Sequence, residues 1–392
     1  MLHHVKPSVN PSHILRNLAI RFHQIRAISN RSSFKNRHIE DNNVDTNYTR
    51  KRKDNQEEEE EERLQLHKSK GQHLLTNPRI LDSIVKNSGV GPEDTVLEIG
   101  PGTGNLTMKL LEIARKVVAV ELDTRMVDVL HKRVSDHRFR DNLTIICKDA
   151  LKVDFPDFDL VVANIPYGIS SPLVAKLVFG GYKFRSATLL FQKEFATRLL
   201  ANPGDSEYNR LAVNVKLVAD VEHVMNVSKR DFVPTPKVDS SVVNIRLKNE
   251  VPDVDLNEWW AFTKTCFGKK NKTLGATFRQ KKKAAELLSL SKVTKVDEDV
   301  AQDDAWHISD NEDGDGDEDE DKEDEGNLLG TEANLFKEKL IGILRTAGLE
   351  DKRPSKLSNK ELLHLLSLFN NEGICFHDQE KPLDINASFA AS

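Results

Sequence analysis

The sequence predicts an α/β protein that is built on a mostly parallel sheet and followed by a smaller helical domain. Five short β-rich runs alternate with helical stretches between residues 95 and 200, an order typical of a parallel sheet covered on both faces. Two later β-rich runs are too close together for a crossover helix, so they should pair antiparallel at the sheet edge. After residue 250 the β signal stops, and aromatic residues follow at helical spacing.

The individual elements follow from local patterns. Asn77-Pro78 is a suitable helix start, and Ile80, Leu81, Ile84 and Val85 after it have helical spacing. Strands are predicted at residues 95–99, 116–121, 143–147, 159–163, 187–192, 221–227 and 238–247. Helices are predicted between them at residues 105–113, 124–134, 171–178 and 194–200.

The chain of 392 residues is long enough for two domains and tails. Residues 67–250 should form the α/β domain, residues 251–375 the helical domain and residues 376–392 a tail. Residues 296–330 are predicted to be a disordered acidic insert, because residues 303–325 hold fourteen acids and one lysine. That tract carries a charge of −13 against −5 for the whole chain, which leaves the remainder at +8. A basic remainder suits a polyanionic partner.

Residues 1–66 are predicted to be a transit peptide and a disordered charged linker. The first 39 residues contain no Asp or Glu but seven Lys or Arg, a composition typical of organelle targeting. We expect the mitochondrion rather than the chloroplast. A disordered basic tail and an RNA-binding arm are the alternatives. The basic cluster at residues 50–53 resembles a nuclear signal, which leaves a nucleolar location open.

Other classes of protein are disfavoured. Cys147, Cys266 and Cys375 are far apart and form no CxxC motif, so neither a disulfide framework nor a metal site is indicated. No apolar run approaches the roughly 18 residues that a membrane span requires. We expect a monomer with no membrane partner.

The first functional motif is a glycine loop after the strand at residues 95–99. Gly100, Gly102 and Gly104 can bring the backbone close to a ligand at a helix start, although a tight turn without a ligand would use the same residues. The spacing departs from GxGxxG and so disfavours a nicotinamide dehydrogenase. Glu121, at the end of the second strand, is suited to bind ribose hydroxyls, and Asp149, after the third, an adenine amine. Each could also be an ordinary strand-end acid, but together they predict a nucleoside site.

The second motif is Asn164-Ile165-Pro166-Tyr167, directly after the strand at residues 159–163. The Asn164 side-chain oxygen and the Ile165 carbonyl can accept hydrogen bonds from an aromatic amine, and Pro166 stiffens the turn. Tyr167 can stack on a flat ring. Methyl transfer then requires alignment more than a strong base. The two motifs together indicate an amino-group methyltransferase, whereas the second alone could be an Asn-Pro turn with a packed tyrosine.

Two further segments have a functional and a structural interpretation. Phe232 precedes two prolines and could close the pocket opposite Tyr167, or pack in the core. Residues 268–283 hold seven Lys or Arg and no acid, with Phe267 and Phe278 beside or within the run. This run could contact phosphates or could be a solvated helix face.

As a set, these motifs resemble the ribosomal RNA adenine dimethyltransferases, particularly the eukaryotic branch that modifies small-subunit rRNA. The likeness covers about residues 68–285, and residues 370–374 are similar to the C-terminus of that branch. The motifs that carry it lie at residues 71–75, 98–104, 121–123, 164–167, 232–241 and 270–274. The resemblance implies a Rossmann-like S-adenosylmethionine-dependent methyltransferase sheet, mostly parallel with an antiparallel edge strand. It also implies a helical domain that binds rRNA.

The resemblance further implies S-adenosyl-L-methionine as the donor and two adjacent adenines near the 3′ end of small-subunit rRNA as acceptors, each methylated twice within a pre-ribosomal particle. Two positions depart from the family pattern. Ile165 replaces the usual Leu, and Gly168 replaces a polar residue, which puts any contact from that side chain in doubt. The transit-like start suggests a mitochondrial member. By the family pattern the donor site comprises His73, Leu75, Gly100, Glu121, Asp149 and Asn164.

Two other functions remain as alternatives. Relatives of this fold serve as nucleic-acid-binding mitochondrial transcription factors, but the intact tetrad at Asn164 and the acid at Glu121 argue against a purely structural role. Methylation of DNA adenine or of a protein glutamine amide would also present a planar amine, whereas the Phe232 loop and the helical domain favour rRNA.

Overall fold

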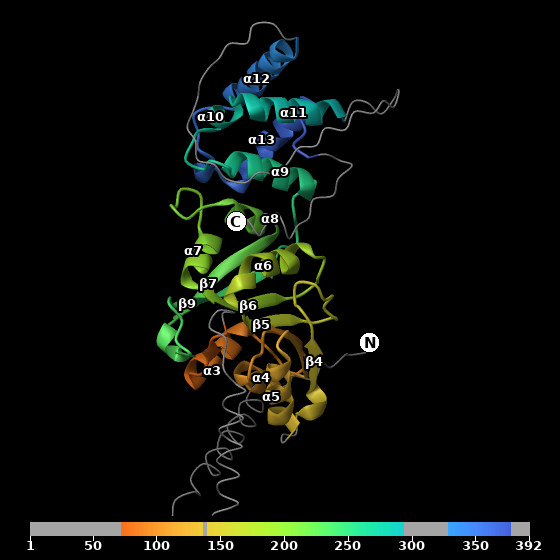
Figure 1. Ribbon diagram of the computed structural model, residues 1–392, viewed down its shortest axis with the longest axis vertical. Helices are drawn as coiled ribbons and strands as arrows, with labels where there is room; N and C mark the ends of the chain where they lie inside the picture. Colours follow the sequence, from red (N-terminus) through yellow and green to blue (C-terminus); the bar gives the residue numbers. More distant parts are fainter. Residues whose placement is uncertain (1–71, 136–138, 294–327, 378–392) are drawn as a thin grey trace, which may run out of the picture. The chain divides into compact units, whose positions relative to one another are not determined.

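A computed structural model describes residues 72–135, 139–293 and 328–377 (Figure 1). All of these residues belong to the compact unit Leu64–Ser392. The predicted transit peptide and linker at residues 1–66 lie outside the described residues, as do most of the acidic insert and nearly all of the C-terminal tail.

A seven-stranded sheet has the order β4-β3-β2-β5-β6-β9-β7. Strands β2 to β6 run parallel to one another, and β9 runs antiparallel to both of its neighbours. The mostly parallel sheet is therefore confirmed. The reversed strand β9 is the inner member of the late pair, and β7 forms the edge. The bounds are β2 (Thr95–Ile99), β3 (Lys116–Glu121), β4 (Leu143–Cys147), β5 (Leu160–Asn164), β6 (Ser186–Gln192), β7 (Ala219–Val227) and β9 (Ser240–Leu247).

Helices cover both faces of this sheet. The alternation of side chains along β2 sends Val96 into the core shared with α3, α4 and α5, and Leu97 and Ile99 into the core shared with α6, α7 and α8. The sequence pattern did not predict α8, because nearly all of its residues are buried and it shows no polar face to reveal a helical period. The bounds are α3 (Pro78–Ser88), α4 (Asn105–Leu111), α5 (Thr124–Ser135), α6 (Ser170–Phe179), α7 (Lys193–Leu200) and α8 (Arg210–Val218).

A two-stranded ladder lies apart from the main sheet. Strand β1 (Leu74–Leu75) pairs antiparallel with β8 (Phe232–Val233), which places Leu75 opposite Phe232. Strands this short have no readable alternation, so the sequence pattern did not predict them. The remaining short elements are the 3₁₀ helices η2 (Arg140–Asn142), η3 (Tyr167–Ile169), η4 (Lys229–Asp231) and η5 (Pro354–Lys356).

The described residues after the sheet are helical, as predicted. Trp259, Phe262 and Leu365 lie in the same hydrophobic cluster as the α6 side of the sheet, so the two parts share one core although the predicted boundary near residue 250 falls between β9 and α9. Helix α12 begins at Leu328, so the last three residues of the predicted disordered insert are helical. No described helix has the length and apolarity required to cross a membrane. The bounds are α9 (Leu256–Phe267), α10 (Leu274–Phe278), α11 (Lys281–Val293), α12 (Leu328–Thr346) and α13 (Asn359–Asn371).

Candidate active site

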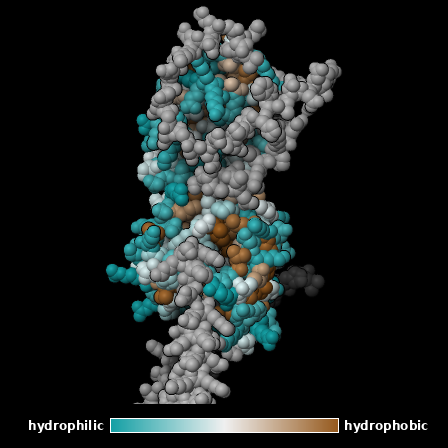
Figure 2. Space-filling model, viewed as in Figure 1, coloured by the Kyte–Doolittle hydropathy of each residue, from teal (hydrophilic) through white to brown (hydrophobic). Residues whose placement is uncertain are grey.

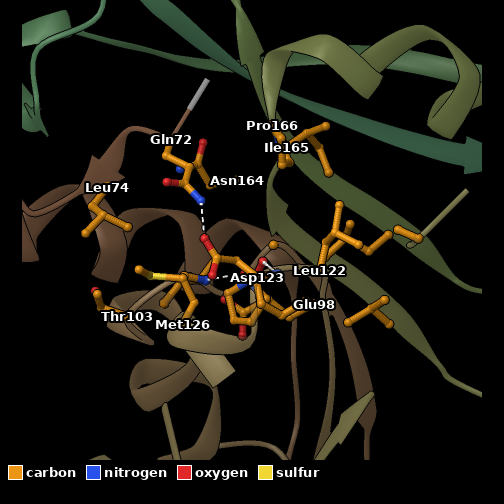
Figure 3. A pocket seen from close by; sticks show the side chains of 18 of the residues that line it. Gln72, Leu74, Glu98, Thr103, Leu122, Asp123, Met126, Asn164, Ile165 and Pro166 are labelled. Atoms are coloured by element: carbon orange, nitrogen blue, oxygen red, sulfur yellow. Dashed lines mark hydrogen bonds between the residues drawn. The ribbon is translucent and has the colours of Figure 1, made fainter. Parts of the chain in front are cut away.

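A cavity of about 610 Å³ lies at the carboxyl ends of β2, β3, β4 and β5. Its size is typical of a small-molecule site, and its place is where open α/β sheets bind ligands. Figure 3 shows side chains from several strands and loops directed toward it. The predicted site residues that line it are His73, Leu75, Gly100, Glu121, Asp149, Asn164, Ile165, Pro166 and Tyr167.

The glycine loop makes room for neighbouring side chains. Gly102 and Gly104 both have positive φ, at 56° and 86°. A Cβ on Gly102 would lie 2.8 Å from Leu74, and one on Gly104 would lie 2.5 Å from Leu130. A larger residue at either position would therefore combine backbone strain with a close contact.

Glu121 ties the glycine loop to the end of β3. Its Oε2 accepts from the Gly102 N–H at 3.1 Å, and its Oε1 accepts from the Asp123 N–H at 2.9 Å. Each carboxylate oxygen has a second lone pair, so the group can also accept from ligand hydroxyls. Asp149 similarly uses Oδ1 to accept from Leu151 N–H at 2.9 Å. Both acids are thus held by backbone groups at the cavity wall.

Glu98 is a cavity residue to which sequence reasoning assigned no role. Its side chain is 1% exposed, and its Oε2 finds no hydrogen-bond partner in the described part of the chain. Burial raises the pKa of this carboxyl to about 8, and the Glu121 charge adds to the rise, while the nearby Thr107 hydroxyl opposes it. The available signal was an acid inside an otherwise apolar strand, directly before the glycine loop.

The structure holds the Asn164 side chain in a defined orientation. Its Nδ2 donates to the His73 carbonyl at 3.2 Å, and its Oδ1 accepts no hydrogen bond from any described residue. The Ile165 side chain is 1% exposed and lies in the core, so only the Ile165 backbone can act at the cavity. Replacement of the usual Leu by Ile therefore changes the packing in the core but leaves the Ile165 main-chain carbonyl available as an acceptor.

Tyr167 is held from two sides. Its hydroxyl shares a hydrogen bond of 3.2 Å with the Ser240 hydroxyl, and its ring stacks on His73 with centroids 5.6 Å apart and planes inclined by 30°. Partial burial raises the pKa of the Tyr167 phenol, and the Ser240 contact lowers it by less. The ring is thus a neutral, fixed surface. Beside it, Gly168 lines the cavity, and a Cβ there would meet nothing within 4 Å.

Phe232 does not line the cavity. Its side chain is 1% exposed and packs in the hydrophobic cluster with Leu75, its partner in the ladder. Of the two interpretations of this residue, core packing describes the present arrangement. A role as the second wall opposite Tyr167 would require the side chain to leave that core, and it stays a prediction.

The basic run at residues 268–283 is likewise divided between surface and core. Lys269, Lys272 and Lys282 are exposed, whereas Phe278 is fully buried against Phe369. Phe278 therefore stabilises the helical core and is not available to stack on a base. The lysines remain available for phosphate contacts.

Gln72 and Asp123 also lie at the cavity without having been assigned a role. Gln72 Nε2 donates to Asp123 Oδ2 at 3.0 Å, across a sequence separation of 51 residues (Figure 3). No local pattern predicts such a contact, because it depends on how the segment before α3 lies relative to the end of β3. Asp123 also pairs with Arg125, and this guanidinium holds the pKa of Asp123 well below its usual range.

Comparison with known proteins identifies the family. The family described as "Ribosomal RNA adenine dimethylase" matches residues 63–305. An Arabidopsis thaliana protein named "Ribosomal RNA small subunit methyltransferase, mitochondrial" is 67% identical over 318 residues, 80% of this chain and 82% of that one. Another from the same species, "Ribosomal RNA small subunit methyltransferase", is 48% identical over 329 residues, 80% of this chain and 93% of that one.

A solved structure supports the same relationship. The crystal structure of a dimethyladenosine transferase from Plasmodium falciparum is 38% identical, with a TM-score of 0.64, and covers 78% of this chain and 100% of that chain. The family match spans more than half of the chain, and it includes the glycine loop, the strand-end acids and the tetrad at Asn164. The chain therefore belongs to the ribosomal RNA adenine dimethylase family.

Proposed function

We propose that this protein uses S-adenosyl-L-methionine to dimethylate the N6 amines of two adjacent adenines near the 3′ end of mitochondrial small-subunit rRNA. We further propose that it acts as a monomer on a pre-ribosomal particle. The observation that carries the proposal is the orientation of Asn164. Asn164 lines the same cavity as the strand-end acids, and its side-chain oxygen accepts no hydrogen bond from any described residue.

The donor side of the cavity has the right chemistry for a cationic nucleoside. Carboxyl groups line the cavity at Glu98, Glu121 and Asp149. Glu98 Oε2 has no hydrogen-bond partner among the described residues, and a cation or an ammonium group could supply one. S-adenosylmethionine supplies a methyl group on a positively charged sulfur, together with ribose hydroxyls and an adenine amine. We assign the hydroxyls to Glu121, the adenine amine to Asp149, and the rest of the donor contact to His73, Leu75, Gly100 and Asn164.

The acceptor side orients a weak nucleophile. The lone pair of an exocyclic adenine amine is delocalised into its ring, and hydrogen bonds from its two N–H groups to Asn164 Oδ1 and the Ile165 carbonyl turn it toward the donor methyl. Each transfer would form one N–C bond and break the bond between the donor sulfur and its methyl group, so the sulfur leaves as a neutral thioether and the nitrogen releases one proton. Asn164 does not titrate, so it positions the amine and the proton passes to water. The Tyr167 ring, backed by His73, supports the flat base.

The rRNA contact is assigned to the exposed lysines of residues 268–283. Lys269, Lys272 and Lys282 lie at the surface of the helical part, and the described residues there are mainly hydrophilic in the view of Figure 2. Exposed lysines bind phosphates without reading sequence. This segment would therefore contribute affinity, and the cavity would select the adenine.

The mitochondrial address rests on two independent observations. The first 39 residues are free of acids and rich in basic residues. A 67% identical relative carries the word mitochondrial in its name. Residues 1–66 lie outside the described residues, so the composition and the relative are the support for this part of the proposal.

Mapping dimethyladenosine by mass spectrometry tests the proposed function. Small-subunit rRNA from mitochondria, plastids and the cytosol should be compared between normal cells, cells lacking this protein and cells complemented with the wild type or Asn164→Ala. We expect the mark to disappear from mitochondrial rRNA and to return only with the wild type. Loss from plastid or cytosolic rRNA instead would reassign the organelle, and no loss anywhere would contradict the proposed substrate. The location of a reporter protein fused to residues 1–66 checks the proposed mitochondrial targeting separately.

A further inference from the structure

Residues 72–75 form a segment of the cavity wall, called the strap below, that contacts both the tetrad and the residues next to Glu121. Gln72, His73, Leu74 and Leu75 all line the cavity. The strap is held at its far end by the β1–β8 ladder and by Asn105 Nδ2, which donates to the Leu75 carbonyl at 2.9 Å. Its near end is held by the contact from Gln72 to Asp123.

The middle of the strap contacts two residues of the catalytic tetrad. The His73 carbonyl accepts from Asn164 Nδ2, and the His73 ring stacks on Tyr167. His73 Nδ1 also donates to the Pro234 carbonyl at 2.7 Å, which fixes the ring. A shift of the strap would therefore displace both the group that orients the amine and the ring that supports the base.

The near end of the strap connects to the donor site. Glu121 accepts from the Asp123 N–H. Asp123 in turn accepts from Gln72 (Figure 3). Hydrogen bonds and one peptide link thus join the acid that we assign to the ribose with the strap that holds Asn164. Since Gln72 and Asp123 are partly buried, their charge-assisted contact is stronger than a bond in open water.

We propose that Gln72 and Asp123 are positioning residues, which latch the strap so that Asn164 and Tyr167 are aligned for methyl transfer. The proposal rests on the adenine-methylating activity of the family and names residues through which the site is held. It requires that breaking the latch slow transfer more than it weakens donor binding. Precise alignment is the main requirement of this chemistry, and small displacements lower the rate steeply.

The test is single-turnover methylation of small-subunit rRNA by the full-length protein, with active sites counted by calorimetric titration with S-adenosylmethionine. Expressing the rate per donor-binding site removes any contribution from unfolded protein. We expect Gln72→Ala and Asp123→Ala each to lower this rate about tenfold to hundredfold, consistent with loss of one hydrogen bond to a charged group. We expect the Kd for the donor to change about threefold or less.

Two further variants separate the latch from other functions of Asp123. Asp123→Asn keeps an oxygen that can accept from Gln72 but gives up the charge that Arg125 pairs with, so it should be faster than Asp123→Ala and slower than the wild type. The double variant Gln72→Ala/Asp123→Ala should be no slower than the slower single variant, because both remove the same contact. Asp82→Ala is the matched control: Asp82 lies on α3, directly after the strap, and the change removes a partly exposed ion pair with Lys109 on α4.

Three outcomes would overturn the latch. These are an unchanged rate per donor site, an Asp123→Asn variant as slow as Asp123→Ala, or rate losses that multiply in the double variant. A wild-type protein that fails to methylate this rRNA would contradict the proposed function instead. In that case the same variants can be compared on any RNA that the wild type does methylate.

Discussion

Asn164 donates its side-chain N–H to the main-chain carbonyl of His73, 91 residues earlier in the chain. This single bond settles which way the amide faces. The nitrogen points to the strap, and the oxygen is left for a ligand that brings N–H groups. Because a protein that binds nucleotides without methylating them needs no such acceptor, the orientation favours catalysis over a purely structural role.

Asn164→Ala should abolish methylation while the protein stays folded. The change removes the acceptor for the amine and leaves a small space in a cavity wall, so the transition state loses its alignment. We expect the rate to fall at least about a hundredfold, as when one preorganised polar group is removed from an active site. Methyl incorporation into rRNA measures the rate, and thermal unfolding checks the fold. Wild-type-like methylation by this variant would falsify the assigned role.

Glu121→Gln should weaken donor binding. The wild-type carboxylate accepts from two backbone N–H groups, and the amide of glutamine can provide only one acceptor oxygen. The loss of a hydrogen bond to a charged group corresponds to about a tenfold to hundredfold rise in the Kd for S-adenosylmethionine. Titration calorimetry measures it. An unchanged Kd would show that Glu121 serves only to hold the glycine loop.

Glu98→Gln should gain stability relative to the wild type as the pH rises. The folded state raises the pKa of Glu98 to about 8 from 4.5, so the folded protein binds the proton more tightly than the unfolded chain. The free energy of unfolding therefore falls as the pH rises from about 4.5 to about 8. The fall is at most roughly 1.4 kcal/mol for each pH unit in this range. Glutamine does not titrate and avoids this loss.

Urea unfolding of the wild type and Glu98→Gln at pH 5 and pH 8.5 tests this expectation. The difference in unfolding free energy between variant and wild type should grow with pH, by an amount on the order of 3–5 kcal/mol if the full shift is expressed. A difference that is the same at both values would mean that Glu98 is ionised throughout and has a partner in solution.

Gly168→Ser should be tolerated. A Cβ at this position meets nothing within 4 Å, and Gly168 has no backbone angle in the left-handed region. We expect a rate within about threefold of wild type and an unchanged unfolding temperature, since Gly168 is exposed and a side chain there meets no protein atom closely. A gain in rate would show that the family's polar side chain contributes to the site. A large loss would show that the target base occupies this space.

Replacing Lys269, Lys272 and Lys282 by alanine should weaken rRNA binding and reduce its salt dependence. Each phosphate contact contributes about 0.7–0.9 to the slope of log Kd against log salt concentration. The triple variant should therefore lower that slope by about two if these lysines contact phosphates. Filter binding at several salt concentrations measures it, and Lys86→Ala, an exposed lysine on α3, is the control. A slope equal to that of the control would favour the alternative interpretation, in which residues 268–283 are a solvated helix face.

The order of the elements in the α/β part could be predicted because each strand is short, apolar and bounded by turns. Strands β2, β3 and β4 begin and end at the predicted residues. Their β-rich runs are followed by a glycine loop after Ile99 and by mainly polar residues after Glu121 and Cys147. Helix α8 was missed because a helix with nearly all of its residues buried lacks an amphipathic pattern. The ladder of β1 and β8 was missed because two residues carry no period.

The sequence by itself determined which groups meet at the cavity, because the glycine loop, the strand-end acids and the tetrad each lie at or just after the end of a parallel strand. Such strand ends meet at one edge whatever the details of packing. Only the tertiary structure decided how these groups are held. Glu98 and Phe232 are buried, and His73 contacts Asn164 and Tyr167. These arrangements depend on segments that are dozens of residues apart in the chain. Long-range packing sets those distances and the exclusion of water, and no local pattern encodes them.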